Sequence, residues 1–162
     1  MDLDVLLCDH AQVAGGKLFV AGANIDRVGL PAGTPPPYLV NFALAGVVHV
    51  PWTATNNEHS LGFVLLTEDS QRPAFPPQME GQDIRGEMRF NVGRPPHLAS
   101  GEEQLVPFAF NFQGIPLMQT GRYVLELELD GTSARRVNLS LTVEQQSLIR
   151  GPGGPADYNL PR

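Results

Sequence analysis

Cysteine is almost absent from the sequence. Cys8 is the only one in 162 residues, so no disulfide bond can form within the chain. Long apolar runs are missing too, since no window comes near the roughly 18 apolar residues that a membrane-spanning helix needs. The first residues, from Met1 to Asp4, lack the basic region that opens a secretory signal peptide. From these absences we expect a soluble, cytoplasmic protein.

Positive charge is also scarce. Lysine and arginine total 11 against 17 aspartates and glutamates, which gives a net charge of −6. An acidic chain without a basic stripe is a poor match for the phosphate backbone of nucleic acids and for an anionic membrane surface. We therefore expect neither as a partner.

No long stretch is without glycine or proline. The chain has 17 glycines and 15 prolines, and each proline in a helix interior costs about 3 kcal/mol. This composition excludes a helical bundle. The length suits one domain, and an apolar content of 42% is enough for a sizeable core.

Apolar and polar residues instead alternate with a period of two, which is typical of half-buried strands. The clearest case is the segment 122–129, where Tyr123 and the leucines share one face. Asp130-Gly131 follows as a hairpin signal, and the segment 136–143 repeats the alternation, as does 84–92.

Other segments also predict strands: 3–13, 17–28, 38–50, 61–68 and 104–112. The segment 38–50 is apolar on both faces, which favours a central strand, whereas Pro107 places the segment 104–112 at an edge or a bulge. The sequence thus predicts an all-β fold, an antiparallel eight-stranded β-sandwich of immunoglobulin-like or C2-like topology over residues 1–143.

Two finer predictions follow from the alternation. If residues 130–134 form the last connection, Glu128 and Arg136 face each other as an exposed cross-strand pair. The side chains expected to be nearly fully buried are Phe42, Leu44, Phe63, Leu65, Phe90, Leu125, Leu127, Leu139 and Leu141.

Residues 144–162 differ from the rest, because Gly151-Pro152-Gly153-Gly154-Pro155 fits neither a helix nor a sheet. We predict an extended, flexible tail that leaves the sandwich at the same end as Met1. The tail has few charges and carries apolar residues, so it is either a disordered terminus or a docking segment for a neighbouring subunit or another protein. Its candidate interface residues are Leu148, Ile149, Tyr158 and Leu160.

Cys8-Asp9-His10 invites a nucleophile interpretation that strand geometry opposes. A strand puts Cys8 and His10 on one face and Asp9 on the other, so the three cannot form a catalytic relay by themselves. We expect Cys8 to pack as a small apolar group. Asp9 shares the apparent core face, and we expect its carboxylate to bond backbone N–H groups near the turn 14–16, or Lys17.

The spacing of residues does not indicate a site for a metal or a cofactor. The histidines, at positions 10, 49, 59 and 97, show no ligand spacing, and the acidic residues are not clustered as calcium loops require. No nucleophile-elbow, phosphate-loop or dinucleotide motif occurs. We therefore predict no metal, no cofactor and no catalytic activity.

The connections offer the remaining candidates. If every strand crosses the sandwich once, residues 14–16, 51–59, 93–102 and 130–134 share one end, and residues 30–37, 70–82 and 114–121 share the other with both termini. Trp52 beside Arg94 and His97 has the composition of an interface anchor. A sugar-stacking platform is the second interpretation, and a Trp52 lid over the core edge is the third. The candidate ligand residues are Trp52, Asn56, His59 and Arg94, with Asn57 nearby.

Several short motifs occur together in this chain: Leu7-Cys8-Asp9-His10-Ala11-Gln12-Val13, Gly16-Lys17-Leu18, Gly22, Asp26-Arg27-Val28, Val50-Pro51-Trp52-Thr53, Val92-Gly93-Arg94-Pro95-Pro96, Gly121-Arg122-Tyr123 and Asp130-Gly131. As a set they resemble an uncharacterised, largely actinobacterial family of small all-β proteins with no assigned activity. The resemblance spans roughly residues 3–143. It implies the fold class and a cytoplasmic setting, and no chemistry. Such proteins more usually have a small residue where this chain has Cys8 or His10.

Taken together, the sequence favours a non-catalytic interaction or assembly module that binds another protein or a second copy of itself. A small-ligand or carbohydrate-binding domain that uses the Trp52 loop is the alternative, and an enzyme is the least favoured. A polar pocket at the Trp52 end would favour the ligand, whereas an apolar patch or a symmetric contact would favour the interaction module.

Overall fold

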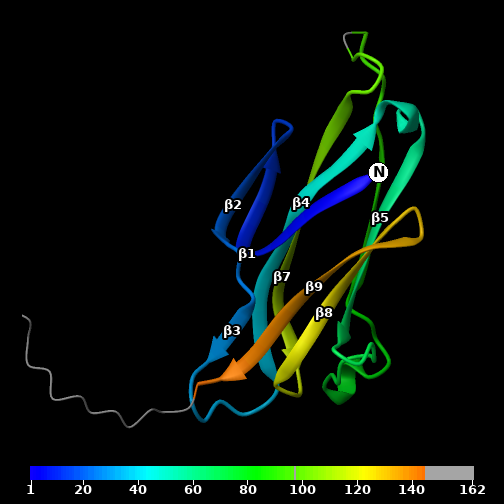
Figure 1. Ribbon diagram of the computed structural model, residues 1–162. Coiled ribbons are helices and arrows are strands. Elements are labelled where there is room, and N and C mark those ends of the chain that lie inside the picture. Colours follow the sequence, from blue (N-terminus) through cyan, green and yellow to red (C-terminus); the bar gives the residue numbers. More distant parts are fainter. Residues whose placement is uncertain (97, 145–162) are drawn as a thin grey trace, which may run out of the picture.

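Two β-sheets face each other around one core in the computed structural model, which describes residues 1–96 and 98–144 (Figure 1). One sheet is four-stranded, in the order β2 (Lys17–Ala23), β1 (Asp2–Ala14), β4 (Tyr38–Pro51) and β7 (Glu103–Leu117). The other is five-stranded, in the order β3 (Arg27–Leu30), β9 (Thr132–Val143), β8 (Gly121–Leu129), β5 (Glu58–Thr67) and β6 (Arg85–Asn91). Two short 3₁₀ helices, η1 (Trp52–Ala54) and η2 (Pro77–Met79), lie in the connections. The predicted all-β class is confirmed.

The described residues form nine strands, so the predicted count of eight is wrong. The segment 17–28 was expected to be one strand, but Gly22 and Asn24 both adopt positive φ angles, of 63°. These residues turn the chain from the four-stranded sheet to the five-stranded one. The far side of the turn is β3, which pairs in parallel with β9, while every other pairing of the described strands is antiparallel.

β4 lies between β1 and β7 and is buried on both faces, as its sequence predicted. Ala43 and Leu44 point to opposite faces, and each has no exposed surface. β7 is an outer strand of its sheet, which confirms the prediction for Pro107. A proline has no N–H to donate, so Pro107, opposite Val47, fits a position whose N–H would point away from β4.

The core lies between the sheets and contains all the side chains predicted to be buried except one. Phe90 is only half-buried, because β6 is the outer strand of the five-stranded sheet and has a neighbour on one side only. Phenylalanine rings connect the two sheets: Phe63 from β5 lies 4.8 Å from Phe110 and 5.2 Å from Phe112 of β7. Phe42 stacks on Phe112 at 4.6 Å, and Phe108 lies 5.8 Å from Phe110.

The connection between β8 and β9 is shorter than predicted. Asp130 and Gly131 have φ angles of 50° and 73°, the pair of positive values that defines a tight type I′ turn. Next to the turn, the pairing of β8 with β9 shifts register between Leu127 and Glu128, and Ala134 of β9 is left without a partner in the register. Arg136 therefore lies opposite Glu126, and Glu128 lies opposite Ser133. The predicted Glu128–Arg136 pair is wrong for this reason.

The hairpin of β1 and β2 folds over the outer face of its own sheet, which curls into a half-barrel. Pairing between β1 and β4 ends at Cys8 and Ala43, and beyond that point β1 crosses toward β7. Small side chains make this close approach possible. A second cluster of buried residues forms there from Cys8, Ala11, Ala43 and Ala45, with Leu6, Leu18 and Ala109 against it.

The motif around Cys8 is structural. Cys8 has no exposed surface and packs among alanines, which confirms the prediction that it acts as a small apolar group. Burial raises the pKa of its thiol, and the nearby Asp9 carboxylate adds to the rise. The prediction for Asp9 is wrong, because its side chain is exposed on the strand edge beside Gly22. The curl of β1 removes this position from the core face.

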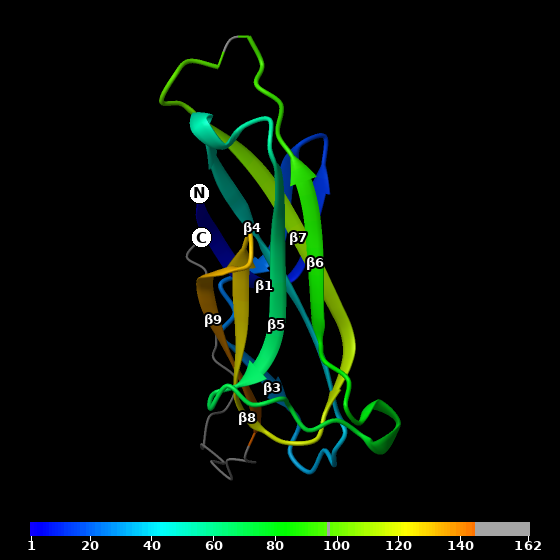
Figure 2. The ribbon, with the colours of Figure 1, turned by 90° about the vertical axis from the view of Figure 1, so that its right-hand side faces the viewer.

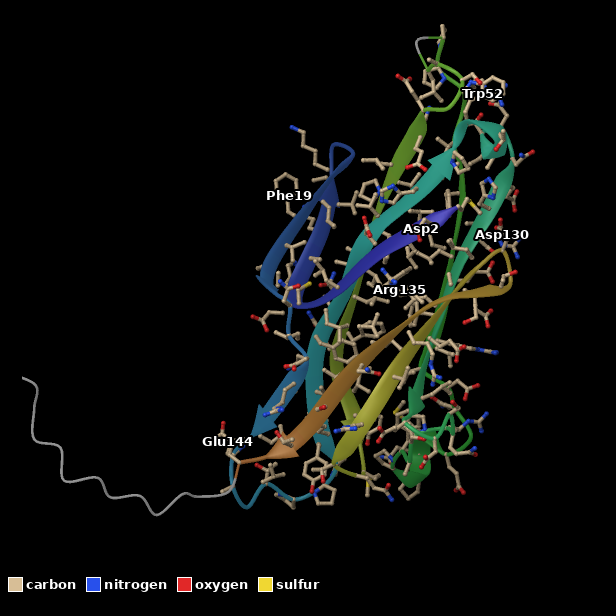
Figure 3. The ribbon with its side chains drawn as sticks, viewed as in Figure 1. Asp2, Phe19, Trp52, Asp130, Arg135 and Glu144 are labelled. Carbon is tan, nitrogen blue, oxygen red and sulfur yellow. The ribbon has the colours of Figure 1, made fainter. Side chains whose placement is uncertain are left out.

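The two ends of the molecule carry different connections. Trp52 and Asp130 lie at one end and Glu144 at the other (Figure 3). At the Glu144 end, Met118 N–H bonds Ala74 O, which brings the predicted neighbours 70–82 and 114–121 together. The predicted position of the N-terminus is wrong, because Asp2 pairs with His49 and so lies toward the Trp52 end.

Candidate functional site

Two loops meet beside η1, as the alternation of the connections predicted (Figure 2). The Trp52 N–H donates to Glu102 O at 3.1 Å, and the Asn56 N–H donates to Val92 O at 2.8 Å. Asn56 takes a left-handed conformation, with φ 65°, that asparagine tolerates better than most residues. These bonds hold the connection after β4 against the connection after β6.

Arg94 and Trp52 form the centre of this loop cluster. The Arg94 guanidinium lies 3.7 Å from the centroid of the Trp52 ring, a cation–π contact. Its Nη2 donates to Trp52 O at 3.0 Å, and its Nε donates to the Thr55 hydroxyl at 2.8 Å. The Arg94 backbone N–H donates to Asn56 Oδ1 at 3.0 Å. Arg94 is therefore positioned by four separate contacts within the loops.

His59 lies beneath these loops and is 7% exposed. Its Nδ1 is 2.9 Å from Asp130 Oδ2, and its Nε2 is 2.8 Å from Ala54 O. A carboxylate and a carbonyl can only accept, so both ring nitrogens donate and the ring is the charged imidazolium. Burial lowers the pKa of His59, but the bonds to Ala54 and Asp130 raise it by more, and the net direction is upward.

The pKa of Asp130 is shifted in the opposite direction, downward. Burial raises the pKa of its carboxyl, but the Ser60 N–H, bonded to Oδ1 at 2.8 Å, and His59 lower it by more. The result is a buried cation held by an anion at the tip of the β8–β9 turn. His59 was a candidate from the sequence, while its partner Asp130 was noted only as a turn residue.

The candidate residues predicted from the sequence differ in whether their polar atoms are free to contact a ligand. Trp52, Asn56, His59 and Arg94 do come together, but the polar atoms of the last three are engaged inside the loop cluster. From this loop, Ala54 packs against the core, while Trp52 is half-buried with Arg94 over its ring. His97, Leu148, Ile149, Tyr158 and Leu160 lie outside the described residues.

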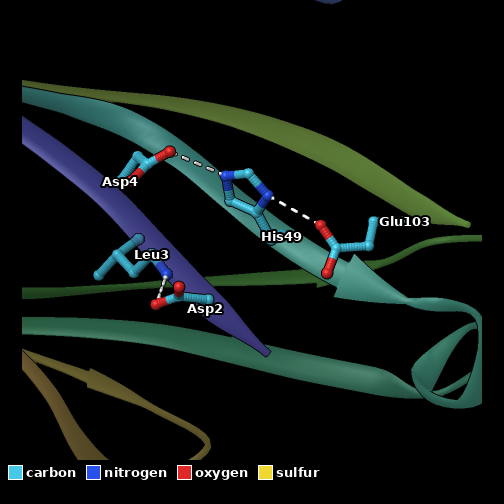
Figure 4. Close-up of polar contacts among 5 residues, drawn as sticks. All are labelled: Asp2, Leu3, Asp4, His49 and Glu103. Atoms are coloured by element: carbon cyan, nitrogen blue, oxygen red, sulfur yellow. Dashed lines mark hydrogen bonds and ion pairs between the residues drawn. The ribbon is translucent and has the colours of Figure 1, made fainter.

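A second histidine holds three strands together at the same end of the molecule. His49 of β4 bonds Asp4 of β1 through Nε2 and Glu103 of β7 through Nδ1, each at 3.0 Å (Figure 4). The bonds to Glu103 and Asp4 raise the pKa of His49. Sequence reasoning missed this arrangement, although His49 shares the outward face of β4 and the register of the flanking strands would have revealed it.

These histidines do not form a metal centre. Both nitrogens of His49 and of His59 are directed at acceptors, so neither ring offers a lone pair to a metal. Within residues 1–96 and 98–144, no group of three or more His, Cys, Asp and Glu side chains could hold a metal ion.

A broad hollow lies elsewhere, on the outer face of the five-stranded sheet. It measures about 830 Å³ and opens where Gly62 leaves a dip between β6 and β8. Charged side chains of both signs line it, and Arg72 and Asp83 on its wall form an ion pair at 2.6 Å. This wide basin is therefore a solvated, charged face.

The four-stranded sheet and its hairpin differ from this basin in their exposed apolar side chains. Apart from Met1, the large apolar side chains that are exposed among the described residues all come from this sheet. They are Val13, Phe19, Val20, Leu39 and Leu105, with exposures between 37% and 61%.

The fold and the loop cluster define an all-β protein of two sheets. The chain belongs to a family of unknown function, DUF6941, whose family model matches residues 3–142. This confirms the resemblance to an uncharacterised all-β family and its extent. No curated protein matches the chain. In the part of the chain that the structure describes, no helix combines the length and the apolar character needed to cross a membrane.

Proposed function

We propose that the protein is a non-catalytic interaction module and that it binds its partner through exposed apolar side chains of the four-stranded sheet and its β1–β2 hairpin. The observation that carries this proposal is that, among the described residues and apart from Met1, every exposed large apolar side chain comes from that sheet. Scattered exposed apolar residues are normal on any protein, but their confinement to one sheet is typical of an interaction surface.

The opposite sheet supports the proposal by contrast. Its outer face carries surface ion pairs, of Arg89 with Glu87 and of Arg122 with Glu68. Such pairs are compatible with water and contribute little to binding. The four-stranded sheet carries charged side chains at its surface too, at Asp4, His49 and Glu103, so the two sheets differ in their exposed apolar side chains and not in charge.

Ligand binding at the Trp52 end is the alternative that the sequence left open. Its support weakens, because Asn56, His59 and Arg94 use their polar atoms to hold the loops together. Trp52 and Arg94 remain candidates for the rim of a protein interface. The partner is another protein or a second copy of this chain.

An immunoglobulin-like or C2-like sandwich is our proposal for the finer architecture. The Tyr123 hydroxyl donates to Gln119 O across the corner between β7 and β8, and Tyr123 is 3% exposed. A tyrosine that bonds backbone a few residues upstream is a feature of Greek-key sandwiches. A bacterial, cytoplasmic setting is part of the same proposal, and the acidic balance of −6 agrees with it.

Site-specific photocrosslinking in the protein's own cells tests the proposed surface. A photoreactive residue at Leu105, which is 61% exposed, should give discrete crosslinked products, of the chain with another protein or with itself. The matched control is Arg89, which is exposed on the five-stranded sheet. Equal products from the Leu105 and Arg89 positions would contradict the proposal. The absence of products from Leu105 and from a second position on the four-stranded sheet, Leu39, would contradict it as well.

A further inference from the structure

β2 is the outermost strand of the four-stranded sheet, and β1 is its one partner among the described strands (Figure 1). Ala11 of β1 uses both its N–H and its C=O on the Asn111 side chain, at 3.1 and 2.8 Å, so its pair with Val20 is not hydrogen-bonded. Since bonding alternates along an antiparallel pair, Leu18 and Val20 direct their N–H and C=O groups away from β1. Within the described part of the chain, no turn or loop backbone bonds these groups. The outer edge of β2 is therefore open to another strand.

The other outer strands of the two sheets carry features that oppose strand addition. β3 has only 4 residues. β6 carries the charged side chains of Arg85, Glu87 and Arg89. β7 contains Pro107, which has no N–H to donate, at a position that faces away from β4. Short length, charged side chains and proline are the usual protection of edge strands. β2 lacks all three, because residues 18–23 contain no charge and no proline.

Apolar side chains lie on both faces of this unprotected edge. Phe19 is 55% exposed on one face, and Val20 is 37% exposed on the other. Figure 3 shows Phe19 projecting from the hairpin away from the rest of the molecule. Neither side chain belongs to a core cluster. A strand added to β2 would remove both from water and would pair the open backbone groups, which is the chemistry of strand addition.

We propose that β2 is the dimerisation edge of the protein and that the strand added to it is β2 of a second copy of this chain. The two strands pair antiparallel about a two-fold axis at Phe19. This residue is the middle of the regular part of the strand, which runs from Lys17 to Ala21. Gly22 ends the regular part, because it has a φ of 63° and no partner in the register of β1 with β2. The axis therefore pairs the two regular segments over their whole length.

The edge is complementary to itself in this register. Leu18 of one copy lies opposite Val20 of the other, and these are the residues whose N–H and C=O groups face the edge, so each pair exchanges both hydrogen bonds. Phe19 lies opposite Phe19 in a pair that is not hydrogen-bonded, where side chains approach most closely and aromatic pairs are stabilising. The two four-stranded sheets then form one continuous sheet.

The charges at the two ends of β2 also favour a second copy. Lys17, at the start, is the only charged residue of the strand. At the far end, the carboxylate of Asp9 lies beside Gly22 and is exposed. Antiparallel pairing brings Lys17 of each copy opposite Ala21 of the other, next to that carboxylate. Backbone bonding, apolar side chains and charge therefore all match across a two-fold axis, as an interface between identical copies requires.

This inference rests on the proposed function and deepens it, because it names a second copy of the chain as the partner of the hairpin. Pairing one short strand from each copy buries less surface than the roughly 1,200–2,000 Å² of a standard stable interface. The dimer should therefore be weak and should dissociate on dilution.

Disulfide trapping in the full chain tests the register. Phe19→Cys places two thiols opposite each other at a Cα separation of about 4.5 Å, which a disulfide can span. Mild oxidation should convert most of this variant to a covalent dimer. Cys8 does not compete, because it is fully buried and burial raises its pKa.

Ala21→Cys is the matched control for the trapping experiment. Ala21 is exposed on the same strand, but the two Ala21 positions lie about 13 Å apart along the paired strands, too far for a disulfide. This variant should stay largely monomeric under the same oxidation. Equal yields of covalent dimer from the two variants, or none from Phe19→Cys, would overturn the proposal.

Sedimentation of the unmodified chain measures the same dimer without a covalent bond. The mass should rise toward that of two chains as the concentration approaches about 1 mM, the range of weak complexes. Val20→Lys should keep the chain monomeric, because a lysine on an edge strand opposes strand addition. Leu105→Lys should leave the dimer intact, since Leu105 is 61% exposed but lies on β7. If Val20→Lys fails to fold, Phe19→Lys replaces it with the same expected result. A monomeric unmodified chain, or equal effects of the β2 and β7 variants, would overturn the proposal.

Photocrosslinking at Leu105 separates a failure of this inference from a failure of the proposed function. Crosslinks from Leu105 to another protein, in a chain that stays monomeric, would overturn the β2 dimer and retain the proposed function. A dimer trapped at Phe19, with no crosslinks from Leu105 or Leu39, would support the β2 edge and contradict a surface that extends over the rest of the four-stranded sheet.

Discussion

At the scale of single residues, the ion pair of His59 and Asp130 makes a pH-dependent contribution to the stability of the fold. The pKa of His59 lies above its ordinary value of 6.5, so its contribution to stability is complete below about pH 6.5 and is lost as the pH rises through the folded value. The pKa of Asp130 lies below its ordinary 3.8, so its contribution is present above about pH 4 and is lost on acidification. The pair therefore stabilises most between about pH 4 and 6.5.

Asp130→Asn tests this window, because asparagine tolerates the positive φ of the turn while removing the charge. The free energy of unfolding in urea should fall by about 1–2 kcal/mol at pH 5.5 and by less at pH 8.5. The magnitude is modest because the Asp130 side chain is 43% exposed and water screens it. Glu87→Gln, in an exposed pair with Arg89, should cost under about 0.5 kcal/mol at both pH values. An equal loss at pH 5.5 and 8.5 from Asp130→Asn would contradict a change in the charge of His59 between these pH values.

Leu127 represents the core at the same scale. It has no exposed surface, and truncating it to alanine removes apolar contacts and leaves a cavity. Leu127→Ala should lower the free energy of unfolding by about 2–5 kcal/mol. Leu105→Ala is the matched control, because Leu105 is 61% exposed and its truncation should cost under about 0.5 kcal/mol. A cost well under about 1 kcal/mol for Leu127→Ala would place this face outside the core.

At the scale of elements, Asn111 decides whether β1 can leave β4. It bonds both backbone groups of Ala11, which is 1% exposed. Asn111→Ala leaves these groups without partners and should cost about 2–3 kcal/mol, with faster hydrogen exchange at Ala11. Asn111→Asp retains an acceptor for the N–H but loses the donor, so the Ala11 C=O faces a carboxylate and the loss should be at least as large. Unchanged exchange at Ala11 in both variants would show that the hairpin is held by packing alone.

The β8–β9 turn makes a second prediction at this scale. Gly131 has a φ of 73°, which an L-residue with a Cβ adopts at a cost of about 1–2 kcal/mol. Gly131→Ala should therefore lower the urea midpoint, with a loss of about 1 kcal/mol. Gly93→Ala is the control, because a Cβ there meets nothing within 4 Å and φ is ordinary. An unchanged urea midpoint in Gly131→Ala would mean that the turn rearranges to the longer connection.

Local patterns predict elements well where one face is buried and the other is wet. The alternation of residues 122–129 identified β8 and its core face, because burial selects apolar side chains at every second position. The break between β2 and β3 escaped prediction, since Gly22 and Asn24 could equally have sat inside a strand. The strand registers were not predicted either. The Asp130-Gly131 turn signal was visible in the sequence, but the extra residue in β9 depends on contacts between strands.

At the scale of the whole molecule, both charged histidines fasten the end that carries Trp52. The pKa values of His49 and His59 are both raised, so both keep their charge to a higher pH than a free histidine and lose it as the pH rises further. Trp52 is the only tryptophan and reports this end alone. At pH 5.5 its fluorescence and the far-UV circular dichroism should change together in urea, whereas at pH 8.5 the fluorescence should change first.

A tryptophan at the other end provides the control for this prediction. In a Trp52→Phe chain with Tyr38→Trp, the reporter lies at the start of β4 near the Glu144 end. Its transition should follow the circular dichroism at both pH values. Early loss of this reporter at pH 8.5 would contradict a weakening confined to the Trp52 end.

The candidate site was predictable from the sequence to the extent that strands alternate in direction. That rule brought Trp52, Asn56 and Arg94 to one end. It failed for the N-terminus, because β1 belongs to a curled sheet and starts beside the end of β4. The roles of Asp130 and Asn111 depend on distances between strands far apart in the sequence, which no local pattern encodes.

The phenylalanines that connect the sheets give the protein an internal spectroscopic signature. Rings of β4, β5 and β7 lie between 4.6 and 5.8 Å from one another. Aliphatic side chains packed against them, such as Leu44 and Leu65, experience the magnetic fields of the circulating ring electrons. Their methyl protons should resonate far upfield of random-coil positions, and a one-dimensional proton spectrum would then report whether the two sheets remain closed on each other.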